Sequence, residues 1–141
     1  MDPSLISTLR DSAVEKLAAA GIESPEVDAE LLIGHVLELS RGEVQAKAIT
    51  GAELGDEDVR AIGSAIERRA AREPLQHITG RAPFRSLELA VGPGVFVPRP
   101  ETEQVAQFAI DALAAAASAS PIGVDLGTGS GAIALAMATE V

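Results

Sequence analysis

The 141-residue sequence contains no cysteine, no tryptophan and no tyrosine, and only 2% of its residues are aromatic. The absence of cysteine excludes disulfides and thiolate metal sites, and it fits a reducing cytoplasm, where we expect the protein to be located. Hydrophobic residues nevertheless make up 47% of the chain. A packed core is therefore possible, but it has to be built mainly from Leu, Ile, Val and Ala.

Long hydrophobic runs and positive charge are also scarce. No apolar stretch reaches membrane-spanning length without a charge, and Met1-Asp2-Pro3-Ser4 lacks the basic start of a signal peptide. The net charge of −10 argues against tight binding to a phosphate backbone. His35 and His77 have no companions at ligand spacing, so no metal site is expected. We expect a protein or small-molecule partner, with no membrane and no direct nucleic-acid contact.

The first half of the chain has the pattern of helices. Apolar residues recur at spacings of three and four in four segments. These segments open at Pro3-Ser4, Ser24-Pro25, Ser40 and Asp56-Glu57-Asp58. The pattern predicts a small helical bundle over residues 1–73. This part holds 15 acidic and 8 basic residues, a net −7, against 6 and 3 in the remainder. We interpret the acidity as solvated helix faces; a docking surface for a basic partner is the alternative.

The pattern changes in residues 74–98. Residues 74–80 predict a short turn or helical piece that leaves the bundle. Residues 81–91 alternate in part, Gly92-Pro93-Gly94 is a turn signal, and Val95-Phe96-Val97 is a second apolar run. We therefore expect a β-hairpin that turns at residues 92–94 and links the bundle to a second domain. A plain connector is the alternative.

A stiff arm follows the linker. Pro98 and Pro100 flank Arg99 and favour extended backbone on both sides of it, and helical spacing begins after Glu101. An arm that presents Phe96 and Arg99 directly before a helix predicts a defined placement of these side chains, and hence a functional role.

The next motif is rich in glycine. Ile122-Gly123-Val124 leads to Asp125, and Gly127, Gly129 and Gly131 then alternate with small polar residues before a helical pattern opens at Ala132. Strand, tight turn and helix in this order predict the first unit of a nucleotide-binding α/β sheet. Glycine lets the backbone turn sharply and lets a ligand lie against bare peptide.

Two cofactors fit this spacing. Gly127, Gly129 and Ala132 match the dinucleotide pattern, whereas Gly127, Gly129 and Gly131 after Asp125 match S-adenosylmethionine-dependent methyltransferases. A carboxylate at the strand tip would repel a diphosphate, but it would attract a ligand that carries a sulfonium and an ammonium. Charge therefore favours S-adenosyl-L-methionine.

Three motifs in order resemble one family. Residues 73–80 (EPLQHITG), 96–103 (FVPRPETE) and 125–131 (DLGTGSG) are similar to the PrmC/HemK family, the N5-glutamine methyltransferases of peptide chain release factors. The resemblance covers essentially the whole chain. It implies an α + α/β fold: a helical substrate-recognition domain over residues 1–73, a linker with a β-hairpin over 74–98, and the start of a Rossmann-like methyltransferase domain over 99–141.

The resemblance also implies an activity and a site. Family members transfer a methyl group from S-adenosyl-L-methionine to the side-chain amide N5 of the glutamine in the Gly-Gly-Gln motif of release factors. The loop would line the methionine and ribose part of the cofactor, and the arm would approach the same site. The implied cofactor-binding residues are Asp125, Leu126, Gly127, Thr128, Gly129 and Gly131 of the loop, and Phe96, Arg99 and Thr102 of the arm.

One family motif is missing. In the family, an Asn-Pro-Pro-Tyr motif holds the glutamine amide for in-line attack on the methyl carbon, and this chain has none. We therefore expect no catalytic residue in this chain, and we expect the chain alone to be inactive. We also expect it to be truncated before that motif, because one strand and one helix of a doubly wound sheet cannot bury their own faces. The alternatives are an acidic helical module that binds a translation protein, an adenine methyltransferase acting on nucleic acid, and an NAD-dependent reductase.

Overall fold

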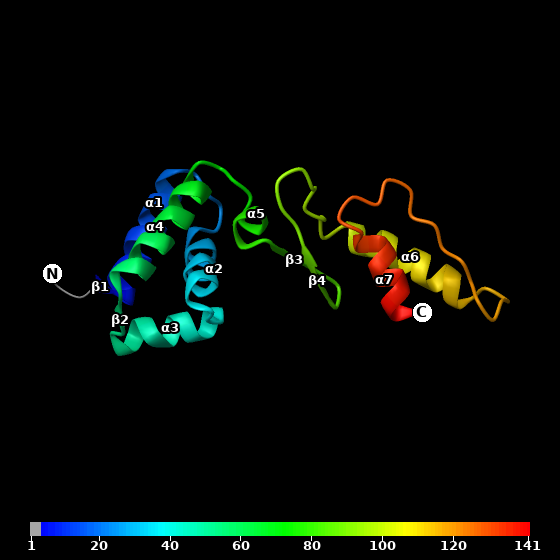
Figure 1. The fold of residues 1–141 in the computed structure, drawn as a ribbon, viewed down its shortest axis with the longest axis horizontal. Helices are drawn as coiled ribbons and strands as arrows, with labels where there is room; N and C mark the ends of the chain where they lie inside the picture. The colour runs from blue at the N-terminus through cyan, green and yellow to red at the C-terminus, as the bar shows by residue number, and fades with distance from the viewer. Residues whose placement is uncertain (1–3) are drawn as a thin grey trace. The chain divides into compact units, whose positions relative to one another are not determined.

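The computed structural model describes residues 4–141, so the predicted helix start at Pro3 lies outside the described residues. The chain forms two compact units, Met1–Thr79 and Gly80–Val141. Figure 1 shows the helices of the first unit in blue to green and those of the second in yellow to red. Each unit has its own hydrophobic core.

The first unit is a helical bundle. Its helices are α1 (Ile6–Ala19), α2 (Pro25–Leu37), α3 (Arg41–Thr50), α4 (Asp56–Ala70) and α5 (Leu75–Thr79). The four predicted helices are confirmed. Helix α3 begins after Ser40, where a helix start was expected. The Ser40 hydroxyl accepts from the Glu43 N–H, and the Glu43 carboxylate accepts from the Ser40 N–H at 2.8 Å. This reciprocal capping box satisfies two N–H groups at the start of the helix.

Two features of this unit differ from the sequence-based expectation. A two-residue strand, β1 (Ser4–Leu5), precedes α1 and pairs antiparallel with β2 (Glu53–Leu54). Strands this short carry no alternating pattern, so the sequence did not reveal them. The expected helical piece in residues 74–80 is present as α5, but it belongs to the bundle: it packs against α2 and α4, and Ile78 is buried in the core, while the second unit begins at Gly80.

A charged residue lies inside the bundle. The Glu30 side chain on α2 is 1% exposed, and its carboxylate accepts hydrogen bonds from Arg10 at 2.7 and 2.9 Å, Arg41 at 2.5 Å and Gln45 at 2.9 Å. Burial alone would raise the pKa of Glu30, but the hydrogen bonds from Arg41, Arg10 and Gln45 outweigh it and lower the pKa. Glu30 therefore joins α2 to α1 and α3 as an ion.

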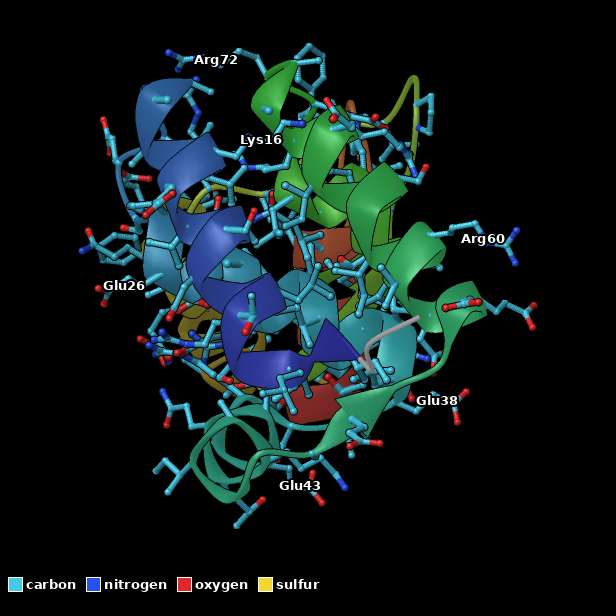
Figure 2. The ribbon with its side chains drawn as sticks, turned by 90° about the vertical axis from the view of Figure 1, so that its left-hand side faces the viewer. Lys16, Glu26, Glu38, Glu43, Arg60 and Arg72 are labelled. Atoms are coloured by element: carbon cyan, nitrogen blue, oxygen red, sulfur yellow. The ribbon has the colours of Figure 1, made fainter. Side chains whose placement is uncertain are left out.

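The acidity of the bundle lies largely on its outside. Figure 2 shows Glu26 and Glu38 reaching away from the ribbon, and both residues are exposed. Their exposure agrees with solvated helix faces and equally with a docking surface for a basic partner.

The second unit contains a hairpin and two helices. They are β3 (Arg81–Phe84), β4 (Leu87–Ala90), α6 (Thr102–Ala114) and α7 (Ala132–Glu140). The predicted hairpin is present, but its turn is at Arg85-Ser86 and not at residues 92–94. In this turn, Arg85 adopts a left-handed φ of 53°. The Gly92 carbonyl accepts from the Val95 N–H at 3.0 Å and so forms a second turn, outside the hairpin. The expected second strand at residues 95–97 is not formed, since these residues have no regular secondary structure.

The core of the second unit lies between the hairpin and the two helices. Phe84, the one aromatic ring in this core, is 1% exposed, whereas Phe96 and Phe108 are exposed. The other buried residues of this core are Ala82, Leu89, Val91, Ala106, Ile110, Ala132, Ala136 and Met137. The small residues of α6 and α7 let these helices approach closely. Buried residues of the hairpin and of both helices share this core, so the three elements form one unit.

The predicted strand before the glycine loop is not formed. Residues 121–126 have no regular secondary structure, because no strand among the described residues pairs with them. The side chains of Ile122, Val124 and Leu126 are 87%, 75% and 88% exposed. Gly123 faces the helices instead, where an added Cβ would lie 3.1 Å from Leu113 and 3.2 Å from Met137. A Rossmann-like sheet is thus not observed in residues 4–141, although the helix after the loop is.

Two helical glycines of the bundle give a direct test of this packing. Gly34 of α2 is buried, and an added Cβ would collide with the backbone carbonyl of Leu39, whereas Gly63 of α4 has nothing within 4 Å. We expect Gly34→Ala to lower the free energy of unfolding by about 1–3 kcal/mol through overpacking. Gly63→Ala should raise it by roughly 0.5–1 kcal/mol through helix propensity. Urea denaturation of the two variants checks this, and equal shifts would contradict the packing described.

Candidate functional site

The glycine loop between Asp125 and α7 is the candidate site. Gly127, Gly129 and Gly131 have φ angles of +69°, +56° and +81°, a region that residues with a Cβ rarely adopt. Gly131 donates its N–H to the Thr128 carbonyl at 2.8 Å and accepts from the Leu135 N–H at 2.8 Å. The same residue thus closes the loop and begins the helix.

The Asp125 carboxylate holds the loop to α7 through hydrogen bonds. Its Oδ2 atom accepts from the Thr128 hydroxyl at 2.9 Å and from the Ala134 N–H at 3.3 Å. One oxygen therefore holds the middle of the loop and the first turn of α7 together. Oδ1 accepts no hydrogen bond from the residues that the structure describes, so it keeps its capacity to bind a donor on a ligand.

The loop is open to solvent. An added Cβ at Gly127 or Gly129 would meet nothing within 4 Å, and the Leu126 side chain is 88% exposed. A ligand can therefore lie directly against the peptide groups of the loop. The N-terminus of α7 attracts negatively charged groups, and the Asp125 carboxylate attracts positively charged ones. This arrangement suits a ligand that carries both charges, and a diphosphate next to Asp125 would be repelled.

The arm contributes a second set of predicted residues. Phe96 is 92% exposed, Arg99 is exposed, and Thr102 is the first residue of α6. The Thr102 N–H donates to the Arg99 carbonyl at 3.0 Å, so these two residues share one turn. Within residues 4–141 no hydrogen bond or ion pair joins the arm to the loop. The structure thus brings the loop residues together, and the placement of Phe96, Arg99 and Thr102 at the same site stays a prediction.

A hollow of about 460 Å³ lies behind the segment that leads to the loop. It is lined by Leu113, Ala119, Pro121, Gly123, Asp125, Ala134, Met137, Ala138 and Val141. Asp125 borders it, but none of the three loop glycines does. We therefore regard it as a gap between this segment and the two helices, separate from the exposed surface of the loop.

The sequence did not reveal two contacts of this region. The Ala134 N–H was not identified as a partner of Asp125, although an acid just before such a loop could have suggested a contact with the first turn of the helix. Arg85 was not identified either, and no motif marks it. Its partners Glu103, Gln107 and Glu140 are 18, 22 and 55 residues away in sequence.

Two further searches cover residues 4–141. In this part of the chain, no group of three or more His, Asp or Glu side chains is arranged to hold a metal ion. None of the helices described has the length and apolar character needed to cross a membrane.

Comparison with known proteins finds relatives that match a large part of this chain. A family model described as the PrmC N-terminal domain matches residues 8–80. A release factor glutamine methyltransferase of Streptomyces coelicolor is 55% identical over 104 residues, which are 73% of this chain and 34% of the relative. One of Bifidobacterium longum is 49% identical over 110 residues, 77% of this chain and 37% of the relative. The chain spans a little over a third of the length of these curated relatives.

The loop geometry predicts an unequal response of two glycines, Gly129 and Gly92. Gly129 has a φ of +56° and Gly92 does not have a positive φ, yet neither has an atom within 4 Å of an added Cβ. Gly129→Ala should therefore lower the free energy of unfolding by about 1–2 kcal/mol, from backbone strain alone. Gly92→Ala should leave it within about 0.5 kcal/mol. Thermal unfolding of both variants measures the difference, and a neutral Gly129→Ala would show that the loop has another conformation.

Proposed function

Because the chain belongs to the PrmC family of release factor glutamine methyltransferases, we propose that its protein methylates peptide chain release factors. The methyl donor is S-adenosyl-L-methionine, and the acceptor is the side-chain amide N5 of the glutamine in the Gly-Gly-Gln motif. The proposal concerns the complete protein, since this chain has no Asn-Pro-Pro-Tyr motif to hold the acceptor amide.

The observation that carries the proposal is the Asp125-braced glycine loop at the start of α7. The donor has an α-carboxylate, an α-ammonium and a sulfonium, and it supplies an electrophilic methyl group when bound. The free N–H groups at the N-terminus of α7 suit the carboxylate. Asp125, with Oδ1 free of partners among the described residues, suits the cationic part, and Gly127 and Gly129 leave room for close approach.

The arm would serve the same site. Phe96 and Arg99 are exposed, and Thr102 opens α6. An exposed aromatic ring gives a flat apolar surface for a ligand, and the Arg99 guanidinium has no ion-pair partner within residues 4–141. We assign these three residues to the cofactor-binding side of the site, where they would orient the donor and exclude water.

The helical unit would bind the protein substrate. It has its own core, matches the family model over nearly its whole length, and has exposed acidic side chains on several helices. Residues 1–73 carry a net charge of −7, which suits a basic protein surface. A non-catalytic module that binds a translation protein is the second candidate, and the same acidic surface supports it.

Calorimetric titration of the complete protein with S-adenosyl-L-methionine tests the site. Asp125→Asn removes the negative charge but keeps an oxygen for Thr128, so the dissociation constant should rise about tenfold or more. Asp56→Asn is the matched control: Asp56 is an exposed acid at the start of α4 in the helical unit, and the loss of its charge should leave the affinity for the donor unchanged.

Mass spectrometry of release factor, incubated with the complete protein and the donor, should show one added methyl group on the Gly-Gly-Gln peptide. Binding of NAD in place of S-adenosyl-L-methionine would favour a reductase and overturn the proposal. Release factor that is bound but never methylated would favour the non-catalytic module.

A further inference from the structure

Arg85 occupies an unusual position in the second unit. It lies in the turn of the β3–β4 hairpin with a φ of 53°, a conformation that costs free energy for a residue with a Cβ. Its side chain is only 18% exposed, which is low for a turn residue. Contacts elsewhere in the unit must therefore hold it in place.

The first set of contacts reaches α6. The Arg85 backbone N–H donates to Glu103 Oε1 at 2.7 Å. The guanidinium donates to the Glu103 carbonyl at 3.3 Å and to Gln107 Oε1 at 2.7 Å. Both partners lie in the first two turns of α6, so the hairpin turn is fixed to the helix start at which the arm ends.

The second set of contacts reaches α7. Arg85 Nε and Nη2 donate to Glu140 Oε1 and Oε2, each at 2.7 Å, which is the bidentate geometry that arginine forms best. The hydrogen bond from Arg85 lowers the pKa of Glu140, and the pKa of Arg85 is raised in turn. Glu140 lies in the last turn of α7, where the helix dipole disfavours an acid. Arg85 offsets this and joins the hairpin to both helices.

These contacts close a loop of the chain. Arg85 precedes β4, the arm follows β4, and Glu103 comes directly after the first residue of α6. The Arg85–Glu103 contacts therefore enclose β4 and the whole arm between two fixed points 18 residues apart. Fixing the ends of a segment removes much of its conformational freedom before any ligand binds.

We propose that Arg85 is a positioning residue: it closes the loop that carries Phe96 and Arg99 and thereby pre-organises the arm for the donor site. The role of the arm at that site rests on the proposed function, but the closure of the loop does not. Arg85 acts through the arm and the two helices, and it makes no contact with residues 125–131.

Amide hydrogen exchange tests the closure without any ligand. In the full chain, Arg85→Gln should speed exchange of the hydrogen-bonded amides at the two ends of the arm, Val95 and Thr102, about tenfold or more, while α1 to α4 and the middle turns of α6 and α7 keep their rates. Arg85→Lys keeps the charge but loses the bidentate fork, so it should restore only part of the protection. Arg68→Gln is the matched control, because it removes a bidentate ion pair with Glu73 in the helical unit and should leave the arm unchanged.

A second variant covers the case in which Arg85→Gln unfolds the unit. Glu103→Ala combined with Gln107→Ala removes both side-chain acceptors that Arg85 has on α6 and leaves the Arg85–Glu140 pair intact, so it weakens the closure of the loop without breaking the contact with α7. Faster exchange confined to Val95 and Thr102 in this variant supports the proposal. Unchanged exchange at these two amides, or equal acceleration throughout α6 and α7, overturns it and assigns Arg85 a general structural role.

Donor binding separates this proposal from the proposed function. In the complete protein, Arg85→Gln should raise the dissociation constant for S-adenosyl-L-methionine about 5–10-fold, with partial recovery in Arg85→Lys. If the wild-type protein does not bind the donor, the proposed function is contradicted. The hydrogen-exchange experiment then still tests whether Arg85 closes the loop. A variant whose arm exchanges faster but which binds S-adenosyl-L-methionine with the wild-type dissociation constant would overturn the proposal that Arg85 pre-organises the arm.

Discussion

The hydrogen bonds of the Asp125 carboxylate are the interaction on which the candidate site depends. Three glycines in the left-handed region form a loop with little side-chain packing of its own. Asp125 connects this loop at Thr128 and α7 at Ala134, so a single oxygen sets the loop and the start of the helix relative to one another. The peptide surface of the loop is bare because Gly127 and Gly129 have no side chains, and the hydrogen bonds of Asp125 hold that surface at the start of α7.

Each of the two units is stabilised by its own set of contacts. The helical unit buries aliphatic residues around Leu17, Leu32 and Ile62, together with the multiply bonded carboxylate of Glu30. The second unit is smaller and relies on one buried ring, Phe84, on small residues between α6 and α7, and on the polar joint made by Arg85. It also exposes Ile122, Val124 and Leu126, which have no strand beside them among the described residues. The surface that would bind the donor therefore lies in the less packed unit.

Local signals allowed most of the helices to be predicted. Ser40 and Glu43 form the capping box that their spacing indicates, and Gly21 follows α1 with a positive φ. The hairpin turn was misplaced because Gly92-Pro93-Gly94 is a stronger local signal than Arg85-Ser86, and the contacts that hold Arg85 in its turn come from helices far along the chain. The predicted strand before Asp125 is absent for a similar reason. Apolar residues can indicate a strand, but a strand needs hydrogen bonds to a neighbouring strand. The motif itself was sufficient to locate the loop.

The most direct measurement is a ¹⁵N NMR titration of the labelled protein with S-adenosyl-L-methionine. If the Asp125-braced loop is the seat of the methyl donor, the largest amide shifts should fall on Gly127, Gly129, Gly131 and Ala132, with smaller shifts in the arm at Arg99 and Thr102. Saturation of the protein by the donor with these amides unmoved, or their movement by NAD and not by the methyl donor, would contradict the account.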